Sequence, residues 1–360
     1  MEQTMEAGMV GGGPEVAIMR QAVAEPGSGV RLEEVAVPVP AAGEVLVRST
    51  LVGICGSDTH AVDGHHPFLT GPYVPGHEVT GVVVDVGSGV RAPTVGQRVL
   101  LKPNLVCGTC VNCLAGRSNA CDSLRWIGCD SSRVLSGAMA DFFVAPAGNL
   151  YPVPDGLGDR AAVLVECMAT PVHAARVAGD LRGARAVVLG AGTIGLLSVV
   201  AALRAGADTV VVTDMEQGKV DRAVRVGALG GVLASLDDVE GRLVTLLGGP
   251  ADVVFDCVVN EQSMALAVGV LRRAGTLLVV GVPRRAERLN LPLVQDWELR
   301  VQGCAAYTGE DIVTALDIAV AGGIPVDELV SATYRLGDIA AAFAAAAANT
   351  SGKVFVTPGA

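Results

Sequence analysis

The sequence predicts an α/β protein in two parts, an irregular β-rich part followed by a doubly wound parallel sheet. Between residues 30 and 150, short Val-rich runs alternate with Gly and Pro, which is typical of strands joined by long loops. From about residue 169, six strand-like runs follow one another with helical patterns in several of the intervals, and this alternation favours a parallel sheet with helices on both faces. The 360 residues also exceed the ~250–300 at which a single core stops growing.

The individual elements follow from these patterns in order. In the first part the strand-like runs are residues 45–54, 79–90 and 96–101. In the second part they are residues 185–190, 209–214, 230–235, 251–256, 275–281 and 299–304, with helical patterns at 198–207 and 219–228. A helical stretch at 311–323, an Ala-rich helix at 339–348 and a last strand at 353–358 form a tail that we expect to pack back on the first part. The predicted organisation is a flexible extension at 1–20, a first domain at 21–168, a second domain at 169–307 and the returning tail at 308–360.

Composition and charge exclude several classes of function. The hydrophobic fraction is 51% and only 18% of the residues are charged, which describes a globular chain rather than a disordered one. The net charge of −11 and the pI near 4.9 disfavour nucleic acid and anionic membranes as partners. Residues 186–203 are uncharged, but glycines interrupt them, so a strand, a turn and a helix explain them better than a membrane span. The first 20 residues contain no apolar run of signal-peptide length, and nine cysteines suggest reduced thiols, so we expect a cytoplasmic protein.

Four cysteines stand close together in CGTCVNCLAGRSNAC, with two residues between each of the first three and seven before the fourth: Cys107, Cys110, Cys113 and Cys121. Four thiolates can surround one tetrahedral zinc ion and leave no position open for a substrate, so the spacing predicts a structural zinc site. The alternatives are four unrelated buried cysteines and an iron–sulfur cluster. The density of cysteines on one Gly-rich loop disfavours the first, and the lack of a proline after the fourth cysteine disfavours the second.

A second set of possible metal ligands is spread over three segments: Cys55 in GICGSDTH, His77 and Glu78 in PGHEVTG, and Glu166 in VECMATPVHA. Sulfur, nitrogen and oxygen ligands from separated loops can form a zinc site whose remaining position accepts water or an alcohol oxygen. Each residue alone is more often a turn or core residue. Together they indicate a catalytic metal centre.

The segment AVVLGAGTIG has the spacing GxGxxG directly after an apolar run and before a helical pattern; the residues concerned are Gly190, Gly192, Thr193, Ile194 and Gly195. The glycines permit a tight turn and a close approach of a pyrophosphate to the N-terminus of the helix. The next strand-like run ends in Asp214, nineteen residues after Gly195, where a carboxylate can bind both ribose hydroxyls. Glu216 adds a second negative charge where a 2′-phosphate would lie. The pattern therefore predicts a Rossmann domain that binds NAD.

Taken in order, the CGSDxH segment, GHE, the four-cysteine loop and the nucleotide motif resemble zinc-containing medium-chain alcohol dehydrogenases, from about residue 30 to the end of the chain. This resemblance implies a GroES-like catalytic domain, two zinc ions per chain, and Cys55, His77 and Glu166 as ligands of the catalytic zinc. Glu78 would be an exchangeable ligand or a neighbouring acid. The glutamate resembles that of the sorbitol and threonine dehydrogenase branch. That branch usually has proline at the next position, where this chain has Cys167, so Cys167 is an alternative ligand.

The resemblance also implies a proton path and further contacts. Ser57 would take the alcohol proton and His60 would pass it toward solvent, which suits a group that titrates near neutrality. A solvated loop residue is the alternative for His60. We expect Asp58 to accept a hydrogen bond from the far nitrogen of His77 and so to fix its tautomer. Lys219 would reach the adenosine ribose.

Three other histidines receive no catalytic role. His65 and His66 stand on a Pro-flanked loop and are expected at most at the rim of a pocket. His173 is expected to pack on the helix that carries Glu166.

The expected function is hydride transfer between NAD and a secondary alcohol, which would be a polyol, a sugar-like alcohol, a cyclitol or an amino alcohol. Ser57 and the glutamate ligand favour polyol or sugar-like substrates. Two alternatives share the fold: a zinc-free quinone or enone reductase, and a catalytically silent NAD-binding protein. A homodimer or homotetramer is expected, because the strand at 299–304 could pair across a two-fold axis.

Overall fold

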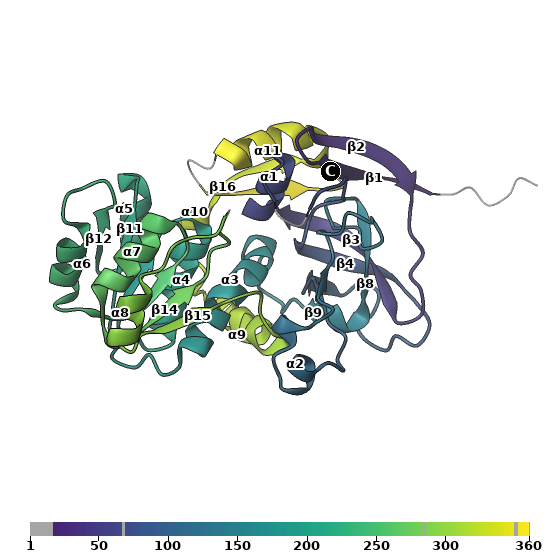
Figure 1. Ribbon diagram of the computed structural model, residues 1–360. Coiled ribbons are helices and arrows are strands. Elements are labelled where there is room, and N and C mark those ends of the chain that lie inside the picture. Colours follow the sequence, from purple (N-terminus) through teal and green to yellow (C-terminus); the bar gives the residue numbers. More distant parts are fainter. Residues whose placement is uncertain (1–16, 67–68, 284, 349–351, 360) are drawn as a thin grey trace, which may run out of the picture.

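The computed structural model describes residues 17–66, 69–283, 285–348 and 352–359, and its two halves are visible in Figure 1. One half is built on a mixed seven-stranded sheet and the other on a parallel six-stranded sheet with helices on both faces. The predicted fold class, an irregular β-rich domain joined to a doubly wound parallel Rossmann sheet, is confirmed.

The sheet of the first half has the strand order β16-β17-β3-β4-β5-β9, with β8 beside β3. Its strands are β3 (Glu44–Gly53), β4 (Glu78–Val86), β5 (Arg98–Leu101), β8 (Phe142–Pro146), β9 (Leu150–Pro152), β16 (Val330–Arg335) and β17 (Lys353–Thr357). Two separate antiparallel pairs consist of β1 (Ile18–Glu25) with β2 (Gly29–Ala36), and β6 (Asn104–Leu105) with β7 (Arg125–Trp126). The connections contain α1 (Gly56–Val62), α2 (Val111–Leu114) and the 3-10 turns η1 (Ser118–Ala120), η2 (Ala147–Asn149) and η3 (Leu336–Asp338).

The core of this half lies between the sheet and the C-terminal tail. Val45 and Val47 of β3 are buried in a cluster that also contains Phe143 of β8 and Phe343 of α11 (Ile339–Ala348), whereas Arg48, the next residue of β3, is exposed. Strands β16 and β17 then extend the same sheet on the far side of β3. From β16 onward the tail therefore packs on the first half, and Figure 1 shows the yellow α11 beside the purple β2.

The second half has six strands in the order β12-β11-β10-β13-β14-β15, and every neighbouring pair is parallel. The strands are β10 (Arg185–Leu189), β11 (Thr209–Asp214), β12 (Gly230–Leu233), β13 (Ala251–Asp256), β14 (Leu271–Val279) and β15 (Arg300–Gly303). Helices α4 (Thr193–Arg204), α5 (Gln217–Arg225), α6 (Val239–Leu247), α7 (Glu261–Val270) and α8 (Leu291–Asp296) fill the connections. All six predicted strands are thus present.

Strand β10 illustrates why this sheet has helices on both faces. Ala186 and Val188 join the core beneath α4, whereas Val187 and Leu189 join a second core beneath α6 and α7. Successive side chains of a strand point to opposite faces, so a strand covered on both sides must be apolar at every position. The uncharged run at 186–203 is accordingly a buried strand, a glycine turn and the helix α4.

Helix α3 (Asp159–Ala178) joins the two halves. It contacts β3 and β4 on one side and α4 and α9 (Gly309–Val320) on the other, and a short helix α10 (Val326–Leu329) follows α9. One continuous helix therefore runs across the domain boundary predicted at residue 168. Of the described helices, α3 alone is long and apolar enough to cross a membrane, but 72% of its apolar window is buried inside the protein, as in a core helix.

The predicted N-terminal extension at 1–20 falls largely outside the described residues. Strand β1 already begins at Ile18, so residues 18–20 belong to the β1–β2 hairpin rather than to an extension. The pairing of residues 18–25 with residues 29–36, from Ile18 opposite Ala36 onward, accounts for this difference.

Candidate metal and nucleotide sites

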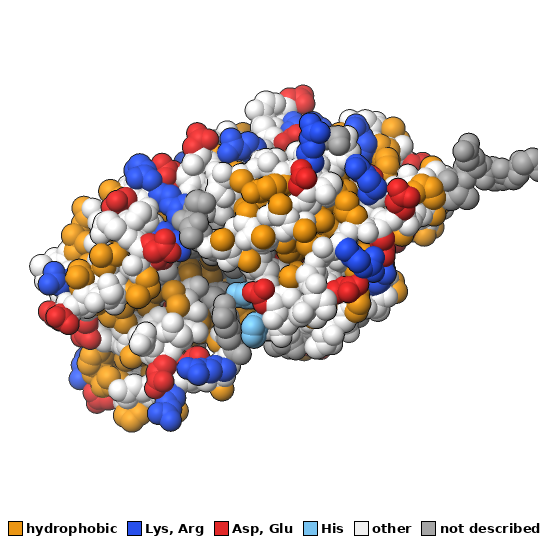
Figure 2. Space-filling model, turned by 90° about the horizontal axis from the view of Figure 1, so that it is seen from above, with side chains coloured by type: hydrophobic (Ala, Val, Ile, Leu, Met, Phe, Trp, Pro, Cys, Tyr) orange, Lys and Arg blue, Asp and Glu red, His pale blue; other side chains and the backbone are white. Residues whose placement is uncertain are grey.

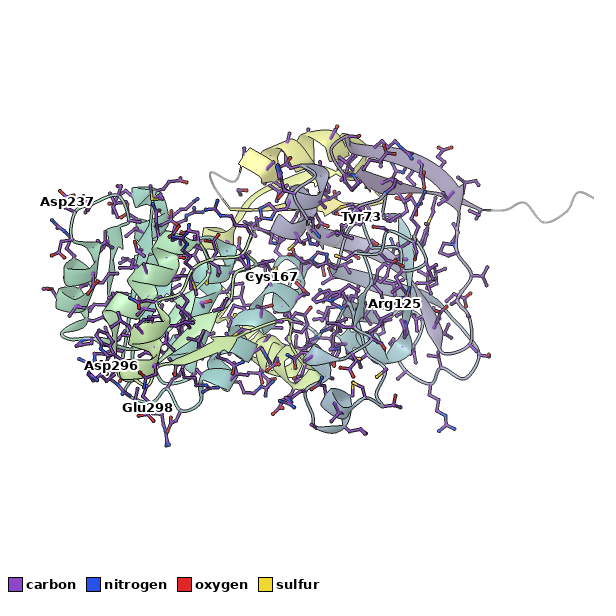
Figure 3. All side chains as sticks on the ribbon, viewed as in Figure 1. Tyr73, Arg125, Cys167, Asp237, Asp296 and Glu298 are labelled. Atoms are coloured by element: carbon purple, nitrogen blue, oxygen red, sulfur yellow. The ribbon has the colours of Figure 1, made fainter. Side chains whose placement is uncertain are left out.

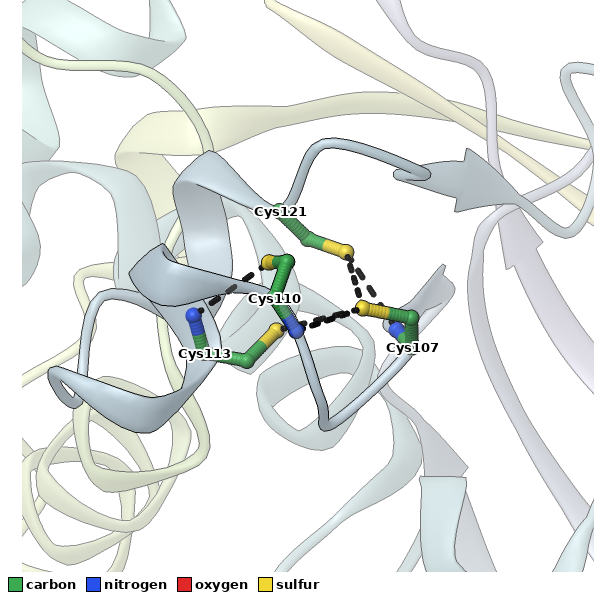
Figure 4. A group of neighbouring side chains, drawn as sticks. All are labelled: Cys107, Cys110, Cys113 and Cys121. Atoms are coloured by element: carbon green, nitrogen blue, oxygen red, sulfur yellow. Dashed lines mark hydrogen bonds between the residues drawn. The ribbon is translucent and has the colours of Figure 1, made fainter.

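The four-cysteine loop follows β6 and encloses α2 (Figure 4). Sγ of Cys107 lies 3.5 Å from Sγ of Cys121 and 4.0 Å from Sγ of Cys113, and all four sulfurs lie within 4.8 Å of one another. A tetrahedron of sulfurs at about 2.3 Å from zinc has edges of about 3.8 Å. The backbone N–H groups of Thr109 and Cys110 point at Sγ of Cys107 and lower its pKa to about 6, which favours the metal-binding thiolate. The loop thus fits one zinc ion held by four sulfurs.

Asn119 joins the four-cysteine loop to the rest of the molecule. Its Nδ2 donates to the carbonyl oxygen of Ala305 at 3.0 Å and lies 3.3 Å from Nε2 of His173. Nδ1 of His173 is 2.9 Å from Oδ2 of Asp311, and both side chains are buried. His173 is therefore a packed residue of α3, as expected, and it links α3 to α9.

Strand pairing brings Cys55, His77 and Glu78 together. Strands β3 and β4 are antiparallel, and Gly53 lies opposite Glu78. Cys55, two residues past the end of β3, therefore lies beside His77, which directly precedes β4. The sulfur of Cys55, a ring nitrogen of His77 and a carboxylate oxygen of Glu78 lie within 4.8 Å of one another.

Glu78 is buried and forms an ion pair with Lys353. Strand β17 pairs with the end of β3, which places Lys353 next to Ile54 and Glu78. The ammonium of Lys353 donates to Oε1 of Glu78 at 2.5 Å and to the carbonyl oxygen of Ile54 at 3.2 Å. Burial is the largest influence and raises the pKa of Glu78, but the charges of Lys353 and His77 and the hydrogen bond from Lys353 together keep this pKa below its ordinary value. Within the described residues, Oε2 of Glu78 has no hydrogen-bond partner. A buried carboxylate oxygen without a protein partner is suited to binding a metal ion.

Glu166 reaches the same place from α3, which packs on β3 and β4. Its carboxylate lies within 4.8 Å of the ligand atoms of Glu78 and Cys167, and it accepts a hydrogen bond from the buried hydroxyl of Tyr307. Burial, opposed by the charge of His77, raises the pKa of Glu166 to about 7. Burial also raises the pKa of Cys167 well above its ordinary value. Figure 3 shows Cys167 on α3, where the two halves meet.

The expected hydrogen bond between Asp58 and His77 is wrong. Among the described residues, Asp58 accepts from the backbone N–H of Cys55 at 3.1 Å and from the hydroxyl of Tyr73 at 3.1 Å. Nδ1 of His77 instead lies 3.6 Å from Sγ of Cys129. Asp58 is in the first turn of α1, where a carboxylate satisfies the free N–H at the start of the helix. Asp58 therefore orients the backbone of Cys55 and not the ring of His77.

Ser57 and His60 lie one turn apart on α1, so their side chains leave the same side of the helix, and both are partly buried. His65 is exposed, and its backbone N–H donates to the carbonyl oxygen of His60 at 2.8 Å. His66 is partly buried, and burial together with the charges of His60 and His77 lowers its pKa. In Figure 2, histidine side chains lie at the edge of a hollow between the two halves.

The nucleotide motif forms the turn between β10 and α4. Gly190 has a φ of +88°, and a Cβ added to Gly195 would lie 1.8 Å from the carbonyl oxygen of Gly190. Only glycine therefore lets the first turn of α4 pack on the end of the strand. Gly192 precedes α4, and Thr193 and Ile194 begin it. The free N–H groups at this helix N-terminus are suited to a pyrophosphate.

Asp214 ends β11 beside this turn, and its Oδ2 accepts from the backbone N–H of Ala191 at 2.8 Å. Lys219 of α5 pairs with Glu216 at 2.7 Å. Lys219 and Arg222 line the same hollow as Gly192 and Thr193. The hollow next to the glycine turn therefore has basic side chains on one wall.

Sequence reasoning did not identify Lys353, Tyr307, Cys129 or Arg222. Lys353 stands at the start of the apolar run KVFVTP, where a charged side chain was a weak signal that it pairs with a buried acid. Arg222 follows Lys219 by one helical turn, which could have placed both on one face of α5. Nothing along the chain distinguished Tyr307 or Cys129, because their contacts depend on distant segments.

Comparisons with known proteins agree with this geometry. Residues 41–155 match the alcohol dehydrogenase GroES-like domain and residues 193–321 match the zinc-binding dehydrogenase family. The chain is 31% identical over 305 residues to L-galactonate-5-dehydrogenase of Escherichia coli strain K12, a match that covers 84% of this chain and 88% of the relative. It is 29% identical over 324 residues to sorbitol dehydrogenase of Bacillus subtilis strain 168, covering 88% and 90%.

A solved structure gives the same result. A zinc-binding dehydrogenase from Sinorhizobium meliloti 1021, bound to NADP, has a TM-score of 0.87 and 31% identity and covers 95% of this chain and 100% of that one. The two family matches fall on the two halves of the fold, and the similar proteins are related over most of their length. The chain therefore belongs to the zinc-containing medium-chain alcohol dehydrogenase family, as the order of its motifs predicted.

Proposed function

We propose that the chain transfers a hydride between a secondary alcohol and NAD at a zinc site formed by Cys55, His77 and Glu166. The observation that carries this proposal is the close group of Cys55, His77 and Glu78, to which Glu166 is joined through its proximity to Glu78. The side chains of His77, Glu78 and Glu166 are buried. The partnerless Oε2 of Glu78 supports a metal ion as the missing neighbour. Relatives named L-galactonate-5-dehydrogenase and sorbitol dehydrogenase support a polyol or sugar-like alcohol, with a cyclitol or an amino alcohol as the alternative.

When bound, zinc would supply a Lewis acid that lowers the pKa of the alcohol, and the nicotinamide would supply the hydride acceptor. The protein holds the metal with one sulfur, one nitrogen and one oxygen, a set that leaves a position open. Glu166 is preferred to Cys167 as the third ligand, because the Tyr307 hydroxyl donates to the Glu166 carboxylate and so orients it, as is usual for ligating carboxylates. Glu78, which forms an ion pair with Lys353, would lie next to the three ligands and act as an exchangeable fourth ligand. The four-cysteine loop would hold the second, structural zinc.

The alcohol proton would leave by way of two side chains on α1. Ser57 lies at the start of this helix and His60 one turn later, close to the exposed segment around His65. A hydroxyl can pass a proton between an alcohol and an imidazole, and an imidazole can exchange it with solvent near neutral pH. Asp58 would contribute indirectly by holding the Cys55 backbone.

The coenzyme would be NAD rather than NADP. A carboxylate at the end of β11 can bind both ribose hydroxyls and repels a 2′-phosphate. The Asp214 carboxylate lies at that position and is held by the N–H of Ala191. Lys219 and Arg222 in the same hollow, and the NADP in the Sinorhizobium meliloti structure, support the opposite choice. Dissociation constants for NAD and NADP, measured in the wild type and in Asp214→Ala, decide between the two coenzymes. Asp214→Ala should weaken NAD binding and so reduce the difference between the dissociation constants for NAD and NADP.

The relatives support two kinds of sugar-like substrate. L-galactonate-5-dehydrogenase is named for a sugar acid and sorbitol dehydrogenase for a neutral polyol. Rates with neutral polyols and with aldonates of the same length distinguish between them.

The test is NAD reduction over a panel of polyols, sugars, aldonates, cyclitols and amino alcohols, combined with metal analysis. Cys55→Ala should abolish oxidation while NAD still binds, because the Rossmann site is separate. The matched control is Cys257→Ala, which removes a thiol in the other half and should keep the zinc content of the wild type. Lack of bound zinc together with reduction of quinones or enones would favour the zinc-free reductase. Two zinc ions without turnover on any alcohol would favour the silent NAD-binding protein.

His60→Ala tests the proton path separately. It should keep zinc and NAD but slow oxidation by ~10–1000-fold, most at low pH, where hydroxide cannot replace the missing base. A pH–rate profile that overlays the wild type would show that His60 is a solvated loop residue.

Assembly and location are also proposed. Strand β15 is the last strand of the six-stranded sheet, and its free edge could pair with the same strand of a second copy in a homodimer or homotetramer. None of the nine cysteines forms a disulfide, which suits the cytoplasm. Sedimentation velocity of the purified chain tests the assembly.

A further inference from the structure

The neighbour of Nδ1 of His77 is a thiol. Sγ of Cys129 lies 3.6 Å from Nδ1 of His77. Sγ, a ring nitrogen of His77 and a carboxylate oxygen of Asp58 all lie within 4.8 Å of one another. Of the proposed ligands of the catalytic zinc, this group contains only His77. Nδ1 faces Cys129, so Nε2 is the ring nitrogen left for a metal ion.

The backbone fixes this contact. Gly76 precedes His77 and Gly128 precedes Cys129, and a Cβ added to Gly128 would lie 2.8 Å from the carbonyl oxygen of Gly76. The φ of Gly128 is +83°, so a side chain there is disfavoured by conformation as well as by space. Two chain segments that touch backbone to backbone place the residues that follow them side by side.

The loop that carries Cys129 is held independently of the metal site. The N–H of Gly128 donates to the carbonyl oxygen of Leu135 at 3.0 Å, and the carboxylate of Asp130 accepts the N–H of Leu135 at 2.9 Å. The ring of Trp126 stands edge-on to that of His77, with 6.0 Å between centroids. The imidazole is thus confined by Trp126 on one side and by Cys129 at Nδ1.

We infer that Cys129 is a positioning residue that accepts the Nδ1–H of His77 and so presents Nε2 to the catalytic metal. Metal-binding histidines usually donate their second N–H to a carboxylate, a carbonyl or water, and loss of that partner typically lowers metal affinity about 10–100-fold. A thiol is a weaker acceptor, but here Asp58 is engaged by Cys55 and Tyr73. The inference rests on the proposed zinc site, and the partnerless Oε2 of Glu78 is the independent sign of a metal there.

Zinc affinity of the catalytic site, measured by chelator competition on the full chain, tests this role. Cys129→Val removes the acceptor and should weaken binding about 10–100-fold, whereas Cys129→Ser restores an acceptor and should stay within about 3-fold of wild type. Cys257→Val is the matched control, because it makes the same change at a cysteine of the other half that, like Cys129, is half-buried. Unchanged affinity in Cys129→Val, or equal losses in the Val and Ser variants, would overturn the inference.

Cobalt substitution separates positioning from direct ligation. If Cys129 only positions His77, the thiolate-to-cobalt charge-transfer band of the catalytic site should keep its intensity per bound ion in Cys129→Ser. Loss of that intensity would show that Cys129 itself binds the metal and would overturn the positioning role. A wild-type chain that binds a single metal ion, in the four-cysteine loop, would refute the proposed catalytic site and this inference with it. Two ions with no effect of Cys129→Val would refute the inference alone.

Discussion

Replacing Lys353 with methionine should destabilise the fold by about 3–5 kcal/mol. The side chains of Lys353 and Glu78 are 7% and 2% exposed, and their charged atoms are 2.5 Å apart. Removing one partner of such a pair leaves the other charge buried without compensation, which costs about 3–5 kcal/mol. The carbonyl oxygen of Ile54 also loses its side-chain donor, which favours the upper part of that range.

Urea denaturation of wild type, Lys353→Met, Glu78→Gln and the double variant measures this cost. The double variant should be more stable than Lys353→Met alone, because no charge is left buried without a partner.

Glu78 has a lowered pKa, so its contribution to the stability of the fold is present above about pH 4.3 and is lost as the pH falls through its folded pKa. Lys353 has a raised pKa, so its share is present below about pH 10.4 and is lost as the pH rises through its folded pKa. The loss in free energy of unfolding caused by Lys353→Met should therefore be constant between about pH 6 and 9. A loss below about 1 kcal/mol, or additive effects in the double variant, would refute the argument.

Three further predictions concern other parts of the chain. Burial lowers the pKa of Lys102 to about 8. The unfolded chain therefore binds more protons between about pH 8 and 10.5, so Lys102→Met should be more stable than wild type at pH 7, by at most about 3 kcal/mol, and should lose this advantage above about pH 10 in paired urea titrations. Cys110→Ser should lower the zinc content from two ions to one and lower the melting temperature, and retention of both ions would contradict a four-sulfur site. Gly195→Ala should abolish NAD binding measured by calorimetry but keep both zinc ions, because its Cβ would lie 1.8 Å from the carbonyl oxygen of Gly190.

Features that depend on nearby residues were predictable from the sequence. The four cysteines lie within fifteen residues, and the nucleotide motif is a strand, a turn and a helix in direct succession. The strands of the second half were recognisable because both of their faces are buried. Each of these patterns depends on local chain geometry, which the spacing along the chain determines.

The contacts that complete the metal site could not be predicted in the same way. Lys353 and Glu78 are 275 residues apart, and Tyr307 and Glu166 are 141 apart. Strand register and the packing of whole helices and strands decide which distant segments come into contact. The partner of His77 shows this well. A carboxylate in the neighbouring helix was the reasonable expectation, but the start of α1 engages that carboxylate, and a thiol from a loop 52 residues away takes its place.

Asn119 has a consequence for anyone who redesigns this chain. The four-cysteine loop projects from the body and would be a natural segment to delete when building a smaller catalyst. Deleting it would remove the donor to the carbonyl oxygen of Ala305, two residues before Tyr307, and the neighbour of His173 on α3. Ala305 is close in sequence to Tyr307, which donates a hydrogen bond to Glu166. His173 lies on α3, the helix that contains Glu166. A shortened chain would therefore need a new brace at this point, and a substituted polar residue reaching Ala305 would be the smallest replacement.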